Sequence, residues 1–205
     1  MTDSRLSLVT AVALALGAVL GLAGSFVSSA ELRGIAWGLD GTALVVGAML
    51  LAVHHLKLGN DQLAAGFLVF AAGETLIVSG SAMELSASAP SFAAGAALWS
   101  AALGLVSASG ALPIVPRITG AIASLLFAVT AIRIFGGAPL TPLSKPLPFN
   151  AYPFLVLTLL GWAWTHYKSS QRGGVAPDPY KVPLRQQNKR HPEAGQEEQK
   201  QTFRK

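Results

Sequence analysis

Three ionisable residues lie within long apolar stretches of the sequence, where a charge has no water around it. Glu74 lies near the middle of one stretch, Asp40 lies in a second, and Arg133 lies near the end of a third. An acid at the centre of a bilayer costs about 2.5 to 3.5 kcal/mol, so it needs a partner, a proton or water. These residues predict a polar site that carries a proton or a cation, with Arg133 balancing one carboxylate.

Helical spacing indicates which way the two acids face. Asp40 shares its helix face with small residues three, four and seven positions away, which predicts that it looks into a helix bundle. Glu74 and Ser81 are seven residues apart and extend one polar stripe. We therefore predict a substrate or ion site formed by Glu74, Asp40, Arg133 and Ser81. Two alternatives remain open: an internal ion pair that fixes helix register, and snorkelling of Asp40 and Arg133 to the interface.

Histidines supply the weaker candidate for metal binding. His54 and His55 close one apolar segment, and His166 closes another. Neutral imidazole is a common metal ligand, but adjacent residues on a helix point about 100° apart and cannot both face one site if the helix continues. A position at the membrane interface explains all three without a partner, so we predict no cofactor and no metal.

No catalytic motif is present in the sequence. It contains no Ser–His–Asp arrangement, no Gly-rich phosphate loop and no HExxH pattern. The absence of cysteine excludes disulfides, thiolate metal sites and a cysteine nucleophile. The sequence therefore favours a protein that is not an enzyme.

The composition is that of a membrane protein. Hydrophobic residues make up 52% of the chain and charged residues 12%, about half the charged fraction of a soluble domain. A spanning helix needs about 20 mostly apolar residues, and the sequence predicts an all-α, polytopic transmembrane bundle of about six such helices. They are approximately Leu6–Val27, Ile35–Val53, Leu63–Ala82, Phe92–Ser109, Ile118–Phe135 and Phe149–Tyr167.

The first apolar segment has a second interpretation. Arg5, the apolar run after it and the small residues Ser28–Ala30 resemble a cleaved secretory signal. A signal has an apolar core of about 7–15 residues, and this run is nearer 22. We predict a retained helix, while cleavage of residues 1–30 would leave five spans.

The basic residues predict the orientation of the bundle. With the N-terminus inside, seven Lys/Arg residues near helix ends lie in the cytoplasm and three lie outside, which favours N-in/C-in. The inner set is Arg5, Lys57, Arg117, Lys168, Arg172, Lys181 and Arg185, and the outer set is Arg33, Arg133 and Lys145. We expect the inner (plasma) membrane of a bacterium as the location.

Two parts of different composition divide the chain. Residues 1–167 form the predicted transmembrane domain, with six basic and six acidic residues. Residues 168–205 carry nine basic and four acidic residues, a net charge of +5, and few apolar side chains, which predicts a disordered cytoplasmic tail. Beside an apolar body, anionic lipid headgroups are a better predicted partner for this tail than nucleic acid.

These features predict a small transporter-like or channel-like protein. The alternative is a non-catalytic structural or accessory subunit, because seams of small residues such as Gly66, Gly73 and Gly80 also serve homo-oligomers and membrane partners. A cavity that reaches Glu74 would favour transport. A dry bundle with an exposed small-residue face would favour the subunit.

Overall fold

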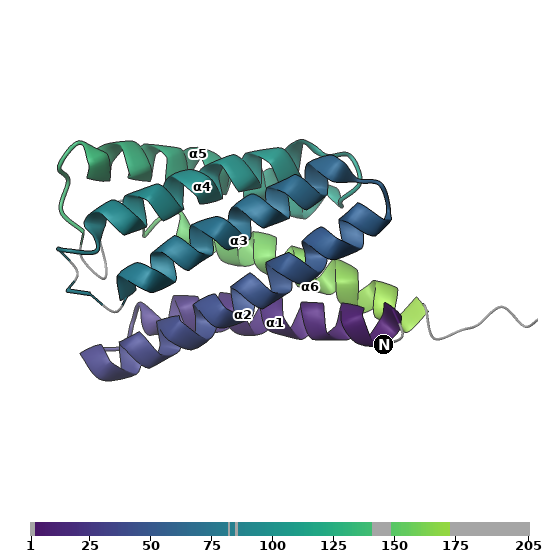
Figure 1. The fold of residues 1–205 in the computed structure, drawn as a ribbon, viewed down its shortest axis with the longest axis horizontal. Helices are drawn as coiled ribbons and strands as arrows, with labels where there is room; N and C mark the ends of the chain where they lie inside the picture. Colours follow the sequence, from purple (N-terminus) through teal and green to yellow (C-terminus); the bar gives the residue numbers. More distant parts are fainter. Residues whose placement is uncertain (1–2, 82, 85, 141–148, 173–205) are drawn as a thin grey trace, which may run out of the picture. The chain divides into compact units, whose positions relative to one another are not determined.

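Six α-helices make up the described part of the chain (Figure 1). The computed structural model describes residues 3–81, 83–84, 86–140 and 149–172. No strand occurs among these residues, so the predicted all-helical fold is confirmed. The helices are α1 (Asp3–Gly24), α2 (Ala30–Lys57), α3 (Asp61–Ser81), α4 (Ala89–Ala108), α5 (Ile114–Phe135) and α6 (Tyr152–Arg172).

Five of these helices, α1 to α5, are long and apolar enough to cross a membrane. The sixth has a comparable length of 21 residues, but its last turns carry His166, Lys168 and Arg172, which lower its hydropathy. The sixth predicted segment is therefore a helix of spanning length with a polar end.

The ends of α2 and α6 differ from the prediction. The helix α2 begins at Ala30, because Ser29 caps its N-terminus. The Ser29 hydroxyl accepts a hydrogen bond from the Leu32 N–H at 3.4 Å. Most of the loop predicted over residues 28–34 is therefore helical. The helix α6 runs to Arg172 and so includes the first five residues of the predicted tail, 168–172. Residues 173–205 lie outside the described residues, so the disordered tail stays a prediction.

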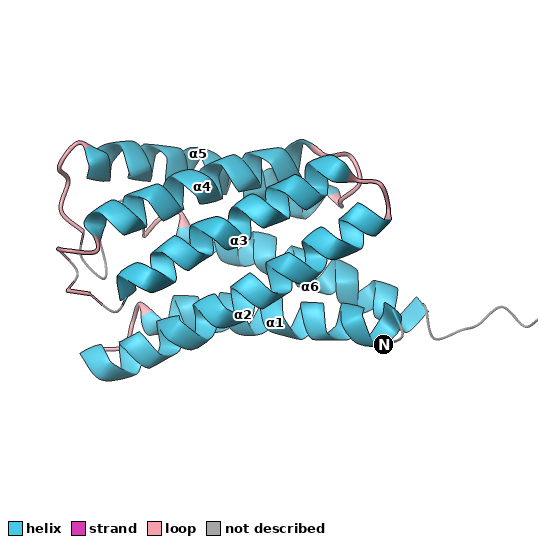
Figure 2. Cartoon of the chain, in the orientation of Figure 1, coloured by secondary structure: helices cyan, strands magenta, loops and turns pink. Residues whose placement is uncertain are grey.

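The helices form a closed ring. Each helix packs against its neighbours in sequence, and α6 packs against α1. Successive helices run in opposite directions, so the connections alternate between the two ends of the bundle (Figure 2). One end holds the α1–α2, α3–α4 and α5–α6 connections. We call it the cavity end, because an internal cavity lies near it. The other end holds the α2–α3 and α4–α5 connections and the last turn of α6.

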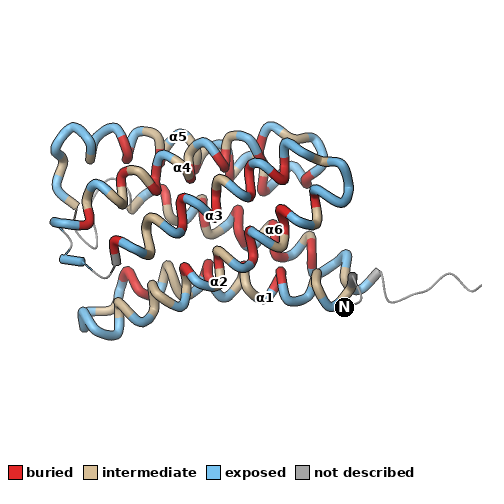
Figure 3. Tube along the Cα trace, viewed as in Figure 1, coloured by how far each residue is buried: buried red, intermediate tan, exposed pale blue. Residues whose placement is uncertain are grey.

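Burial follows the inner side of the ring (Figure 3). The buried core includes Leu14, Phe67, Phe70 and Trp162. Large apolar side chains also cover the outside, where Ile132 is 71% and Leu125 is 70% exposed. An apolar exterior of this extent is stable only against lipid. The chain is therefore a helical membrane protein.

Small residues bring α3 and α4 into close contact. The predicted series Gly66, Gly73 and Gly80 faces α4 along its whole length. At its centre, a Cβ on Gly95 would lie 2.8 Å from the backbone oxygen of Gly73, and a Cβ on Gly73 would lie 3.0 Å from the backbone oxygen of Gly95. The two backbones therefore touch where neither residue has a side chain, which is how helices associate in lipid.

Hydrogen bonds join α4 to α5 on the opposite side of α4. The Ser100 hydroxyl donates to the Ser124 carbonyl at 2.8 Å, and the Ser124 hydroxyl donates to the Ser100 carbonyl at 2.7 Å. This reciprocal pair satisfies both hydroxyls inside an apolar bundle. It leaves α4 fixed on both of its flanks.

We predict that Gly95→Ala destabilises the bundle. The added methyl group meets the Ile77 side chain, at 2.5 Å from its Cγ1, and also the Gly73 backbone oxygen, which cannot rotate away. Overpacking of this kind costs about 1–3 kcal/mol. Thermal unfolding of the purified protein in detergent should show a midpoint lower by several degrees. Gly38→Ala is the matched control, because a Cβ there meets nothing within 4 Å. Equal midpoints for the two variants would contradict the close α3–α4 contact.

Candidate functional site

A cavity of about 90 Å³ opens inside the ring, near the cavity end of the bundle. Five helices contribute to its wall: α1, α2, α3, α4 and α6. A volume of this size holds several water molecules. Its principal lining residues are Gly17, Gly21, Trp37, Asp40, Leu44, Glu74, Ile77, Ser88, Phe92, Trp99, Tyr152, Leu155, Val156 and Leu159.

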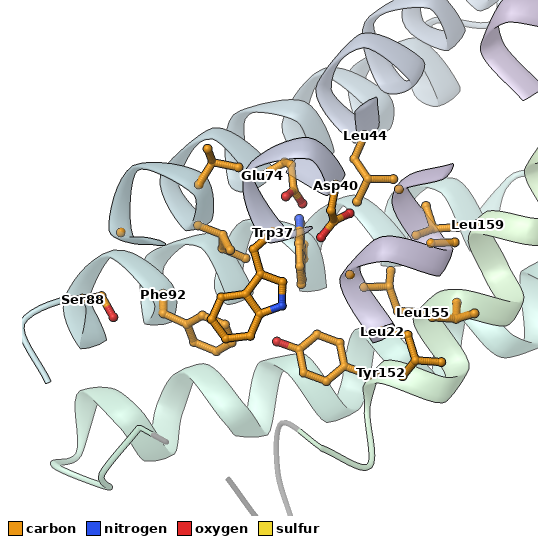
Figure 4. Close-up of a pocket in the computed structure, with 18 of the residues that line it drawn as sticks. Leu22, Trp37, Asp40, Leu44, Glu74, Ser88, Phe92, Tyr152, Leu155 and Leu159 are labelled. Atoms are coloured by element: carbon orange, nitrogen blue, oxygen red, sulfur yellow. The ribbon is translucent and has the colours of Figure 1, made fainter. Parts of the chain in front are cut away.

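Asp40 and Glu74 both line this cavity, and their carboxylates approach one another from adjacent helices (Figure 4). Glu74 is only 1% exposed, and its Oε2 has no hydrogen-bond partner. The Oδ1 atom of Asp40 is also buried without a partner. Unpartnered buried oxygens on two neighbouring acids make the cavity strongly polar and favourable for a positive group.

Glycines provide the space that the two acids occupy. A Cβ on Gly21 of α1 would lie 2.5 Å from Asp40 Oδ2. A Cβ on Gly41 of α2 would lie 2.9 Å from Glu74 Oε1 and would collide with the Val78 side chain. Each carboxylate therefore rests against the bare backbone of the adjoining helix.

The indole nitrogen of Trp99 is a buried donor at the same cavity. It faces Glu74, but the pair does not meet the distance and angle of a hydrogen bond, so Trp99 Nε1 has no partner. Trp99 is 4% exposed. The cavity wall therefore carries an unused donor as well as unused acceptors.

Arg133 does not join the two acids. It lies in the last turn of α5, it is exposed, and α5 supplies no residue to the cavity wall. Within the described residues it forms no ion pair with Asp40 or Glu74. Ser81 ends α3, and its side chain is outside what the structure describes. Of the four predicted site residues, the structure thus brings two together.

Four aromatic residues of the cavity were not predicted from the sequence. Trp37 could have been found, because it lies three residues before Asp40 and so shares its helix face. Phe92, Trp99 and Tyr152 lie on α4 and α6. No sequence pattern connects them to Asp40 or Glu74, since only the closing of the ring brings these helices together.

The three histidines meet at the end of the bundle opposite the cavity. The ring centroids of His54 and His55 lie 5.2 Å and 6.0 Å from that of His166. We expected adjacent histidines to face apart if the helix continued, and α2 does continue to Lys57. Both rings nevertheless lie against the His166 ring, so the expectation that they cannot face one site is wrong. Among the described residues, no set of three His, Cys, Asp or Glu is placed to hold a metal ion.

Aromatic side chains fill the bundle between the histidines and the cavity. His55 stacks on Phe67 at 5.5 Å, and Phe67 meets Trp162 edge-on at 5.0 Å. Trp162 then contacts Phe70 at 5.9 Å, and Phe70 stacks on the cavity residue Trp99 at 5.7 Å. We call His55, Phe67, Trp162, Phe70 and Trp99 the aromatic column. Because three of its members are under 2% exposed, the column separates the cavity from the histidine end.

No protein-family model, curated protein or solved structure matches this chain. The chain forms a helical membrane bundle with an acidic, aromatic-lined cavity toward one end and a closed aromatic column beneath it.

We predict that a cysteine placed in the cavity wall reacts preferentially with a cationic reagent. The chain has no cysteine of its own, so Val156→Cys gives a single thiol at the wall. Aminoethyl methanethiosulfonate should modify it roughly tenfold faster than the anionic sulfonatoethyl reagent, because two carboxylates share the cavity.

Ala48→Cys serves as the control for that experiment, since Ala48 is 0% exposed and does not line the cavity. Its thiol should react with neither reagent. Equal rates for both reagents at Val156→Cys, measured by mass spectrometry, would count against an acidic cavity.

Proposed function

We propose that this protein is a small transporter-like membrane protein that binds a proton or a cation at Asp40 and Glu74. The observation that carries the proposal is the shared cavity of these two acids, where buried carboxylate oxygens have no partner. Among the lining residues there is no Lys or Arg. Such a cavity is suited to a positive ligand.

A purely structural role explains the cavity less well. A bundle that serves only as a scaffold gains stability when its interior is filled with apolar side chains, and an unpartnered buried acid works against folding. Gly21 and Gly41 leave room for the acids instead of closing the space. If the two acids bind no ligand, the protein is instead an accessory subunit.

The basic residues favour a cavity that faces the outside. In the proposed N-in/C-in orientation, Lys57, Arg117 and the tail are cytoplasmic, so the cavity end of the bundle is the outer end. The aromatic column then closes the inner side. One closed side and one side with a cavity is the arrangement expected of a protein that exposes its site to alternate sides.

The basic tail of residues 168–205 fits this orientation. Basic residues near an anionic leaflet add about 1 kcal/mol of attraction each, so the proposed partner of the tail is the cytoplasmic lipid surface of the inner (plasma) membrane of a bacterium. This contact would anchor the last helix without involving the cavity.

The orientation is testable with single cysteines. Glu84→Cys lies in the α3–α4 connection and Lys57→Cys at the end of α2. A membrane-impermeant maleimide added to intact cells should label Glu84→Cys, while Lys57→Cys should be labelled only after the membrane is opened. The reverse labelling pattern would show that the bundle has the opposite orientation. Labelling of both cysteines from outside would refute the placement of Glu84 and Lys57 on opposite sides of the membrane.

The transport function is tested by Glu74→Gln. The full-length protein, reconstituted in liposomes, is exposed to concentration jumps of protons, K⁺, Na⁺ and ammonium on a solid-supported membrane. At least one cation should evoke a charge displacement in the natural chain. In Glu74→Gln that signal should fall at least roughly tenfold, because the amide keeps the shape but not the charge.

Glu84→Gln is the matched control, since Glu84 is exposed and outside the cavity. It should behave like the natural chain. If neither these cations nor methylammonium evoke a displacement, or if Glu74→Gln retains it in full, the transport proposal is overturned and the structural subunit takes its place.

A further inference from the structure

Four aromatic rings share the cavity with the two acids. Trp37 comes from α2, Phe92 and Trp99 from α4, and Tyr152 from α6. Figure 4 shows Trp37, Phe92 and Tyr152 grouped on one side of the cavity and the leucines on the other. A wall that combines carboxylates with aromatic rings is suited to a particular class of cation, because ring faces attract positive charge electrostatically.

A bare metal cation is poorly matched to this wall, because only four of its lining side chains carry oxygen. Ca²⁺ takes six to eight oxygens, and Mg²⁺ takes six in close octahedral order. The polar oxygens of the lining side chains come from Asp40, Glu74, Ser88 and Tyr152. Most of the remaining lining side chains are aliphatic or aromatic. Such side chains favour contact with alkyl groups over contact with an inorganic ion.

An organic ammonium ion matches both halves of the wall. Its charged nitrogen is attracted to carboxylates and ring faces, and its alkyl groups gain by leaving water for Leu44, Leu155 and Leu159. The rim already shows a related contact, because the Arg33 guanidinium lies over the Trp37 ring at 5.7 Å. The Trp37 ring is therefore accessible to a positively charged group.

The volume limits the size of the ligand. A cavity of 150 Å³ in another protein holds benzene, and this one measures about 90 Å³. That space suits a cation with one to a few carbon atoms and excludes large aromatic or polycyclic amines.

We propose that the cavity binds a small alkylammonium ion, with its nitrogen between Asp40 and Glu74 and its alkyl groups against Phe92 and the leucines. This inference rests on the proposed function, because it names the class of cation for the same site. It goes further in requiring that the aromatic rings, and not the acids alone, select the ligand.

The test measures binding to the full-length protein in detergent by isothermal titration calorimetry. Methylammonium and tetramethylammonium are compared with K⁺ and Na⁺ at constant ionic strength. At least one alkylammonium should bind roughly tenfold more tightly than either metal ion, and tetrahexylammonium should not bind at all. Equal binding of K⁺ or Na⁺ would overturn the inference.

Variants separate the contribution of the rings from that of the acids. Phe92→Leu keeps an apolar side chain but removes a ring, so alkylammonium binding should weaken about tenfold or less while K⁺ binding stays as it was. Phe135→Leu is the matched control, because Phe135 is 63% exposed and outside the cavity. Trp37→Leu provides a second ring deletion if Phe92→Leu does not fold. Unchanged alkylammonium binding in a folded ring variant would overturn the inference.

The same variants distinguish this inference from the function on which it depends. A charge displacement by protons, K⁺ or Na⁺ that requires Glu74, without any response to alkylammonium, overturns the ligand class and leaves the transport proposal intact. No displacement by any of these cations overturns both. A displacement by methylammonium that is lost in Glu74→Gln and reduced in Phe92→Leu supports both.

Discussion

The closing contact between α6 and α1 determines much of what this bundle contains. The backbone of each helix lies close only to the backbones of its two neighbours in the ring. The interior is therefore filled by side chains rather than by a central helix, and there the rings of α2 and α3 meet those of α6. Large aromatic residues fill it over much of its length. The filling is incomplete toward the cavity end, where the cavity with Asp40 and Glu74 remains.

Glycine has two separate uses in this structure. At Gly73 and Gly95 the missing side chains let two backbones touch, which supplies the packing that holds helices together in lipid. At Gly21 and Gly41 the missing side chains make room for carboxylates. The first use stabilises the ring and the second keeps it from closing over the acids. Similar sequence patterns thus serve stability in one place and the candidate site in another.

The two ends of the bundle interior differ in chemistry. Toward the cavity end lie two acids, a free indole donor and an open space. At the opposite end lie three histidines in ring contact, with both nitrogens of His55 buried and unpartnered. The contacting rings of the aromatic column fill the interior between them, so a ligand that enters one end meets a barrier before it reaches the other. A protein that moves its ligand across must shift this column, and its stacked rings make Phe67 and Phe70 central to any such movement.

The sequence by itself determined the helices, the membrane environment and the depth of Glu74 and Asp40, because each of these depends on local hydropathy and helical period. It also indicated that Asp40 looks inward, since the small residues on its face are close in sequence. Only the tertiary structure decided that Asp40 and Glu74 share a cavity, that Arg133 lies outside it, and that Phe92 and Tyr152 complete its wall. These relations join helices far apart in the chain, and the rotation of each helix in the ring depends on the packing of all its neighbours.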